Sequence, residues 1–164
     1  MSSYNGTFLI LGSVIASMIL AVAYTPEVWP QWLGWFRPLW IYLTVIFWSF
    51  EYPNRLGLVT VWMIGLLTDV LLADMLGLNA FLLALVTYLG WRLYERFRMY
   101  SALQQSFVIF WLLFGCELAR AITQDQGWGR LVSWEIILPA LSSMLIWPLV
   151  RRFMQKLCSR VEVQ

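Results

Sequence analysis

Long apolar stretches separated by short polar turns make up most of this sequence. A helix that crosses the hydrocarbon core of a bilayer needs about 20 mostly apolar residues. The apolar stretches therefore predict an all-α polytopic membrane protein with six transmembrane helices in one bundle. The expected spans cover residues 7–24, 36–50, 56–73, 77–91, 103–122 and 131–150.

Composition supports this class and limits the protein to one domain. The chain has 164 residues, of which 61% are hydrophobic and 12% are charged, whereas soluble domains carry about 25% charged residues. Six spans use nearly the whole chain and leave only a short basic tail at 151–164, expected in the cytoplasm. Residues 1–6 contain no Lys or Arg, which favours a retained first helix over a cleaved signal peptide.

Basic residues outside the predicted spans fall mostly on one side of the membrane. One side receives eight of them, and the other side receives two, Arg37 and Arg130. Because cytoplasmic loops carry an excess of Lys and Arg, both termini are expected in the cytoplasm. The larger group consists of Arg55, Arg92, Arg96, Arg98, Arg151, Arg152, Lys156 and Arg160.

We expect the stretch at 56–73 to form the central helix, against which the others pack. Its one ionisable residue is Asp69, and Gly65, Asp69 and Ala73 follow each other at intervals of four. Residues four apart share a helix face, and a carboxylate is costly in lipid, so this face should turn toward protein. The sequence leaves open whether Asp69 makes a structural hydrogen bond or has a direct function.

Glu117 and Arg120 are a second polar feature inside a predicted span. Their i, i+3 spacing places them on one helix face, where they can form an ion pair. Alternatively, they line a polar cavity between the third and fifth spans, with Asp69 near its rim. The spacing is compatible with both arrangements.

Residue types that support most enzyme chemistry are absent or scattered. The chain has no histidine, and its two cysteines, Cys116 and Cys158, form no CxxC motif. We find no nucleophile elbow, phosphate-binding loop or metal-ligand motif. The net charge is only +2, and the basic residues do not form one patch. The sequence therefore predicts no enzyme activity, cofactor, metal or nucleic-acid partner.

Tryptophan is abundant, but its distribution does not require a ligand. An aromatic belt at the membrane surface explains the tryptophans near span ends. Trp62 and Trp111 lie deeper along their spans and are expected to pack inside the bundle. The tryptophans assigned to the belt are Trp29, Trp32, Trp35, Trp40, Trp48, Trp91, Trp128, Trp134 and Trp147.

Several short motifs, taken in order, give the chain a family resemblance. They are Phe36-Arg37-Pro38, Pro53-Asn54-Arg55, Gly65-x-x-x-Asp69, Leu76-Gly77, Leu103-Gln104-Gln105, and Ile146-Trp147-Pro148 followed by Arg151-Arg152. With these motifs the chain resembles the MreD family of rod shape-determining proteins over nearly its whole length. Two positions depart from the family pattern: Leu39 replaces a common polar residue, and Asn54 replaces an expected histidine.

The resemblance implies a non-enzymatic subunit of the bacterial elongation machinery in the inner membrane. Such a subunit is expected to bind the single-span scaffold protein MreC, to control lateral peptidoglycan synthesis and to maintain rod shape. Its indirect partners would be MreB, RodA and a class B penicillin-binding protein. The family's bundle is similar to the substrate-binding subunits of energy-coupling-factor transporters. The alternative function is therefore a small-molecule-binding membrane subunit of a transporter.

The candidate sites follow from the motifs and the charges together. The candidate intramembrane pair or cavity is Glu117 with Arg120. Besides its protein partners the chain is expected to contact the lipid bilayer, and the sequence leaves open whether it forms homo-oligomers. The candidate partner-binding or functional residues are Arg37, Pro38, Pro53, Asn54, Arg55, Gly65 and Asp69.

Overall fold

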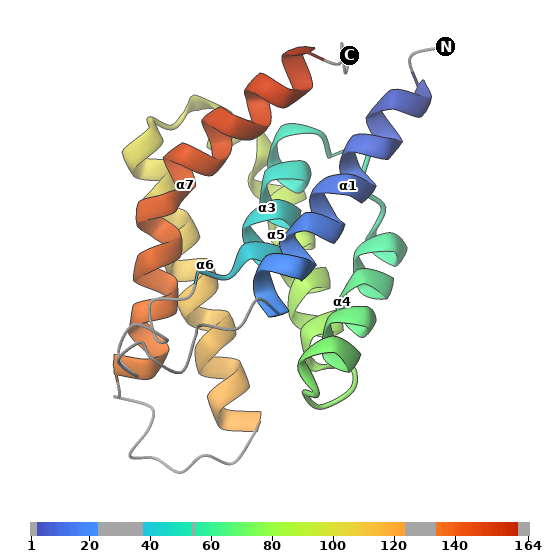
Figure 1. Ribbon diagram of the computed structural model, residues 1–164. Coiled ribbons are helices and arrows are strands. Elements are labelled where there is room, and N and C mark those ends of the chain that lie inside the picture. Colours follow the sequence, from blue (N-terminus) through green and yellow to red (C-terminus); the bar gives the residue numbers. More distant parts are fainter. Residues whose placement is uncertain (1–2, 23–37, 54, 124–133, 161–164) are drawn as a thin grey trace, which may run out of the picture.

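The computed structural model describes residues 3–22, 38–53, 55–123 and 134–160. Every regular element in these ranges is an α-helix, so the predicted all-α class is confirmed. The helices lie side by side, and consecutive helices run in opposite directions (Figure 1). They are α1 (Ser3–Val22), α3 (Trp40–Glu51), α4 (Leu58–Leu72), α5 (Leu78–Met99), α6 (Ala102–Thr123) and α7 (Trp134–Arg160).

Two of the described helices are long and apolar enough to cross a membrane. They are α6 and the part of α7 from Ile136 to Ser159. Three further apolar helices are shorter, namely α3, α4 and the segment Gly6–Val22 of α1. By length and composition, the described helices therefore fit a membrane protein.

Two helices continue beyond the ends of the expected spans. α5 includes residues 92–99 and α7 includes residues 151–160, where the pattern predicts a charged loop and a basic tail. Arg, Lys and Glu are good helix formers, so a change from apolar to charged residues does not by itself end a helix.

The central helix is α3, whereas the sequence pattern predicts that the stretch at 56–73 forms the central helix. Residues 41–50 are all buried, and α3 packs against α1, α5 and α7. α4 covers most of 56–73 but leaves large side chains such as Val59 and Val70 exposed. Both helices are apolar on all sides, so their patterns do not distinguish a central helix from a peripheral one.

A close contact and a tight turn join α4 to α5. A Cβ atom added at Gly65 would overlap the backbone of Ala80 in α5. Ala73, directly after α4, has a φ of 53°, and Gly77, directly before α5, has a φ of 93°. The Gly65–Asp69 face of α4 therefore turns toward protein, as predicted.

The depth of a tryptophan along a predicted span does not correctly predict whether its side chain is buried. Trp62 is 46% exposed and Trp111 is 55% exposed, so both lie on the outer surface and the prediction for them is wrong. Trp48 and Trp147, which the pattern assigns to the membrane surface, are each 1% exposed. The direction in which a helix face points, rather than depth along the helix, decides which indole is buried.

Candidate functional site

Asp69 lies near the C-terminal end of α4 and is 0% exposed. Its Oδ2 accepts a hydrogen bond from the backbone N–H of Gly77 at 2.8 Å, and its Oδ1 accepts one from the backbone N–H of Asn79 at 2.9 Å. N–H groups at the start of a helix lack partners within that helix. Asp69 therefore caps α5 from the neighbouring helix, and its negative charge suits the positive end of the helix dipole.

Asn79 connects this cap to two other helices. Its Oδ1 accepts hydrogen bonds from the Tyr42 hydroxyl of α3, at 2.8 Å, and from Nη2 of Arg120 of α6. Its Nδ2 donates to Asp74 Oδ2 at 3.0 Å. Asn79 is 0% exposed, so its side chain cannot bind water. The hydrogen bonds of this network satisfy both polar atoms of the side chain instead.

Glu117 and Arg120 form the predicted ion pair. Nη1 of Arg120 lies 3.0 Å from Oε1 of Glu117, and the two side chains are 17% and 12% exposed for Arg120 and Glu117 respectively. Nη2 of Arg120 also lies 3.5 Å from the Tyr42 hydroxyl, whereas its Nε has no hydrogen-bond partner within the described ranges. The pair is largely withdrawn from solvent, so each charge depends on the other.

A cavity of about 210 Å³ adjoins this ion pair. Glu117 and Arg120 contribute to its wall, but Asp69 does not, because its carboxylate is engaged with the start of α5. The pair and the cavity therefore occur together, and the expectation that Asp69 lies near the rim is not met. The other lining residues are Ala21, Pro38, Leu39, Trp40, Ile41, Tyr42, Thr68, Leu72 and Pro139.

The remaining candidate residues do not converge on this network. Pro38 precedes α3 and lines the cavity, whereas Pro53 and Arg55 lie in the turn after the other end of α3. Arg37 and Asn54 lie outside the described residues. A helix of 12 residues, such as α3, is about 18 Å long, so Pro38 and Pro53 lie at opposite ends of α3.

A second polar network joins four helices at the end where α7 terminates. Gln105 of α6 is 0% exposed, and its Nε2 donates to the carbonyl oxygens of Phe97 at 2.9 Å and Tyr100 at 3.2 Å. Nη1 of Arg151 in α7 donates to Gln105 Oε1 at 2.7 Å, and Nη2 lies 3.7 Å from Glu51 of α3. Gln105, part of a motif that carries the family resemblance, therefore has a structural role.

These networks hold helices together and offer little for catalysis. Most of their donors and acceptors are engaged with one another, and no group of three carboxylates or cysteines in the described segments could hold a metal ion. Tyr42 and Asn79 are members of the first network that sequence reasoning misses. The available signal is a short amide side chain two positions after Gly77, directly before the apolar run at 80–86.

Comparison with known proteins matches nearly the whole chain to one family. The family model described as rod shape-determining protein MreD matches residues 2–157. The rod shape-determining protein MreD of Haemophilus influenzae is 26% identical over 156 residues, which cover 95% of this chain and 94% of that protein. No solved structure matches this chain.

Proposed function

This chain belongs to the MreD family of rod shape-determining proteins, and on this premise we propose that it is a non-enzymatic subunit of the bacterial elongation machinery. Its proposed role is to bind the single-span scaffold protein MreC in the inner membrane. Through MreC it would control lateral peptidoglycan synthesis and rod shape. MreB, RodA and a class B penicillin-binding protein would then be indirect partners.

The observation that carries this proposal is the position of the exposed apolar side chains. Val59 of α4 is 76% exposed, Leu103 of α6 is 81% exposed and Leu149 of α7 is 71% exposed. Many exposed apolar side chains are unfavourable in water, but they suit contact with lipid and with transmembrane helices. Among the described residues, the surface open to a partner thus includes large apolar helix faces.

Two of the candidate residues would act on a partner only indirectly. Gly65 faces Ala80, and Asp69 is fully buried, so both support the α4–α5 hairpin from inside. We propose that the contacts with MreC come from helix faces and from the turns that contain the two Arg motifs. The residues concerned are Arg37, Pro38, Pro53, Asn54 and Arg55.

Purification of the tagged full-length chain from membranes tests the proposal. In a mild detergent it should recover MreC in a constant ratio, while an unrelated multi-span protein with the same tag should recover none. Isolation of the chain without MreC, from cells that contain both proteins, would contradict the proposal. The family match gives no support to the alternative of a transporter subunit.

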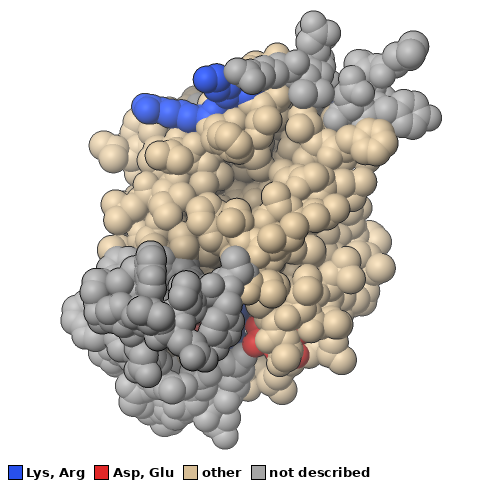
Figure 2. Space-filling view, viewed as in Figure 1, with Lys and Arg blue, Asp and Glu red and all other residues tan. Residues whose placement is uncertain are grey.

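We propose that both termini face the cytoplasm. Two observations support this orientation: α1 begins and α7 ends at the same end of the bundle (Figure 1), and Lys and Arg side chains gather there (Figure 2). A fluorescent protein fused after Gln164 should fold and fluoresce, and an alkaline phosphatase fusion at the same place should be inactive. An active phosphatase would contradict this orientation.

A further inference from the structure

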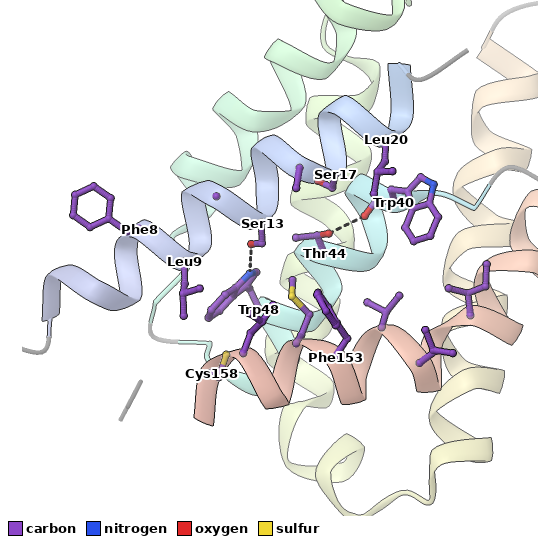
Figure 3. A pocket seen from close by; sticks show the side chains of 17 residues that line it. Phe8, Leu9, Ser13, Ser17, Leu20, Trp40, Thr44, Trp48, Phe153 and Cys158 are labelled. Carbon is purple, nitrogen blue, oxygen red and sulfur yellow. Dashed lines mark hydrogen bonds between the residues drawn. The ribbon is translucent and has the colours of Figure 1, made fainter. Parts of the chain in front are cut away.

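A long apolar groove opens on the side of the bundle between α1 and α7. Its volume is about 460 Å³, which lies in the range of about 300–1,000 Å³ that is common for small-molecule sites. α3 forms its floor through Trp40, Thr44 and Trp48 (Figure 3). The walls are Phe8, Leu9, Gly12, Ser13, Ala16, Ser17 and Leu20 of α1, and Ile146, Leu149, Val150, Phe153, Met154, Leu157 and Cys158 of α7.

The groove is uncharged, and the hydroxyl groups in it are already satisfied. Ser17 Oγ donates to the carbonyl oxygen of Val14 at 2.7 Å, and Thr44 Oγ1 donates to that of Trp40 at 3.0 Å. Ser13 Oγ accepts a hydrogen bond from Nε1 of Trp48 at 3.0 Å (Figure 3). An occupant of the groove therefore needs no polar groups along its length.

Small residues on α1 deepen the middle of the groove. Gly12 and Ala16 both line it and lie one helical turn apart. A Cβ atom added at Gly12 would meet nothing within 4 Å. Packing inside the described chain therefore does not require this glycine, whereas an occupant could lie close to the α1 backbone there.

Two cations lie on α7 alongside the groove. Arg152 and Lys156 are four residues apart on α7, next to the lining residues Phe153 and Leu157. Both are exposed, and neither side chain has a hydrogen bond or ion pair with any other described residue. Arg151 differs, because it is bound to Gln105 inside the bundle. Figure 2 shows that Lys and Arg side chains occur at the end of the molecule where α7 terminates.

We propose that the groove binds an anionic phospholipid, with an acyl chain against α1, α3 and α7 and the headgroup phosphate on Arg152 and Lys156. The apolar groove and the cations beside it match the two halves of such a lipid. Basic clusters beside transmembrane helices attract anionic headgroups, and burial of each methylene adds to the affinity. A purely apolar partner helix would fill the groove but would leave the two cations without a counter-charge. The proposal requires that the protein lies in a membrane, but it does not depend on MreC.

The test measures phospholipid retained by the full-length protein after purification in a mild detergent. Protein reconstituted in vesicles of equal parts phosphatidylglycerol and phosphatidylcholine is extracted, and the bound lipid is quantified by mass spectrometry. We expect phosphatidylglycerol to be enriched over phosphatidylcholine. Thermal unfolding of each variant, measured in the same detergent, verifies that it is folded.

Two variants, each with a matched control, distinguish lipid binding in the groove from general attraction between anionic lipid and basic residues. Gly12→Leu should fill the groove, and its control is Gly115→Leu, because Gly115 of α6 also has nothing within 4 Å of an added Cβ. Arg152→Gln with Lys156→Gln should remove the two cations beside the groove. Its control is Arg92→Gln with Arg96→Gln, a pair of exposed arginines at the same spacing on α5.

We expect Gly12→Leu and the Arg152/Lys156 double variant to retain roughly tenfold less phosphatidylglycerol, and both controls to retain the wild-type amount. Equal losses in the Arg92/Arg96 control would mean general charge attraction and would overturn the proposal. So would normal lipid retention by Gly12→Leu. If that variant instead fails to recover a single-span partner protein, the groove is a helix-docking site.

Discussion

The backbone N–H of Asn79 donates a hydrogen bond to the buried carboxylate of Asp69 at 2.9 Å. The side chain of Asn79 also accepts hydrogen bonds from Tyr42 and Arg120. One asparagine thus links the cap of α5 to the ion pair on α6 and to the central helix. The Asp69–Asn79 contact therefore joins two buried polar features that are separate in the sequence.

Replacement of Asp69 should destabilise the fold. Asp69→Ala leaves the N–H groups of Gly77 and Asn79 without their acceptors, which we expect to cost about 2–5 kcal/mol. The apparent Tm in detergent should fall, and the amount of protein in membranes should fall with it. Glu95→Gln, at an exposed position of α5, is the control and should behave as wild type.

A more conservative change refines this prediction. Asp69→Asn keeps one acceptor oxygen but sets an NH₂ group against a backbone N–H, so its Tm should lie between those of wild type and Asp69→Ala. Rounded cells that contain wild-type amounts of Asp69→Ala with an unchanged Tm would show that the residue acts in partner binding instead.

Charge reversal at Glu117 should also destabilise the protein. Glu117→Lys places two cations 3 residues apart on α6 and removes the partner of Arg120, which is 17% exposed. Loss of one member of a buried pair costs about 3–5 kcal/mol, so accumulation in membranes should drop strongly. Combining it with Arg120→Glu should restore part of the loss. Normal accumulation of the single variant would mean that the pair contributes nothing.

Gly65 should not tolerate a side chain. Gly65→Ala adds a Cβ atom that overlaps the backbone of Ala80, and the cost should be several kcal/mol because backbone cannot move aside cheaply. Gly115→Ala is the matched control, because its Cβ would meet nothing within 4 Å. Thermal unfolding in detergent should show a lower Tm for the Gly65 variant and no decrease for the control.

Ala73→Gly should stabilise the turn between α4 and α5. Ala73 has a φ of 53°, in the left-handed region where a Cβ costs about 1 kcal/mol. Glycine adopts this conformation freely, so the variant should have a Tm a few degrees above that of wild type. Gly77→Ala places a Cβ at a φ of 93° and should have the opposite effect. A lower Tm for Ala73→Gly would contradict this account of the turn.

Arg55→Ala tests the proposed contact with a partner rather than the stability of the fold. Arg55 lies in the turn after α3, and its backbone N–H donates to the carbonyl oxygen of Tyr52 at 3.0 Å, a bond that alanine preserves. Cells should become round while the protein still accumulates in membranes. Arg96→Ala, an exposed arginine on α5, is the control. If cells with Arg55→Ala remained rod-shaped, this would contradict the proposal that the turn after α3 contacts the partner.

The sequence by itself determined the properties that depend on composition and local spacing. High apolar content with few charges indicates helices suited to a bilayer, and the i, i+3 spacing of Glu117 and Arg120 is sufficient to place both on one face of α6. The same holds for the face of α4 that carries Gly65 and Asp69. These features follow from the geometry of a single helix, which depends on residues that are close together in the sequence.

Only the tertiary structure decided which apolar helix is central and which polar groups meet. α3 and α4 are both apolar on all sides, so the direction in which each face points depends on packing against other helices. The contacts of Asn79 join residues 37 and 41 positions away, Tyr42 and Arg120. Such contacts depend on how far each helix is rotated about its axis, and a local sequence pattern does not determine that rotation.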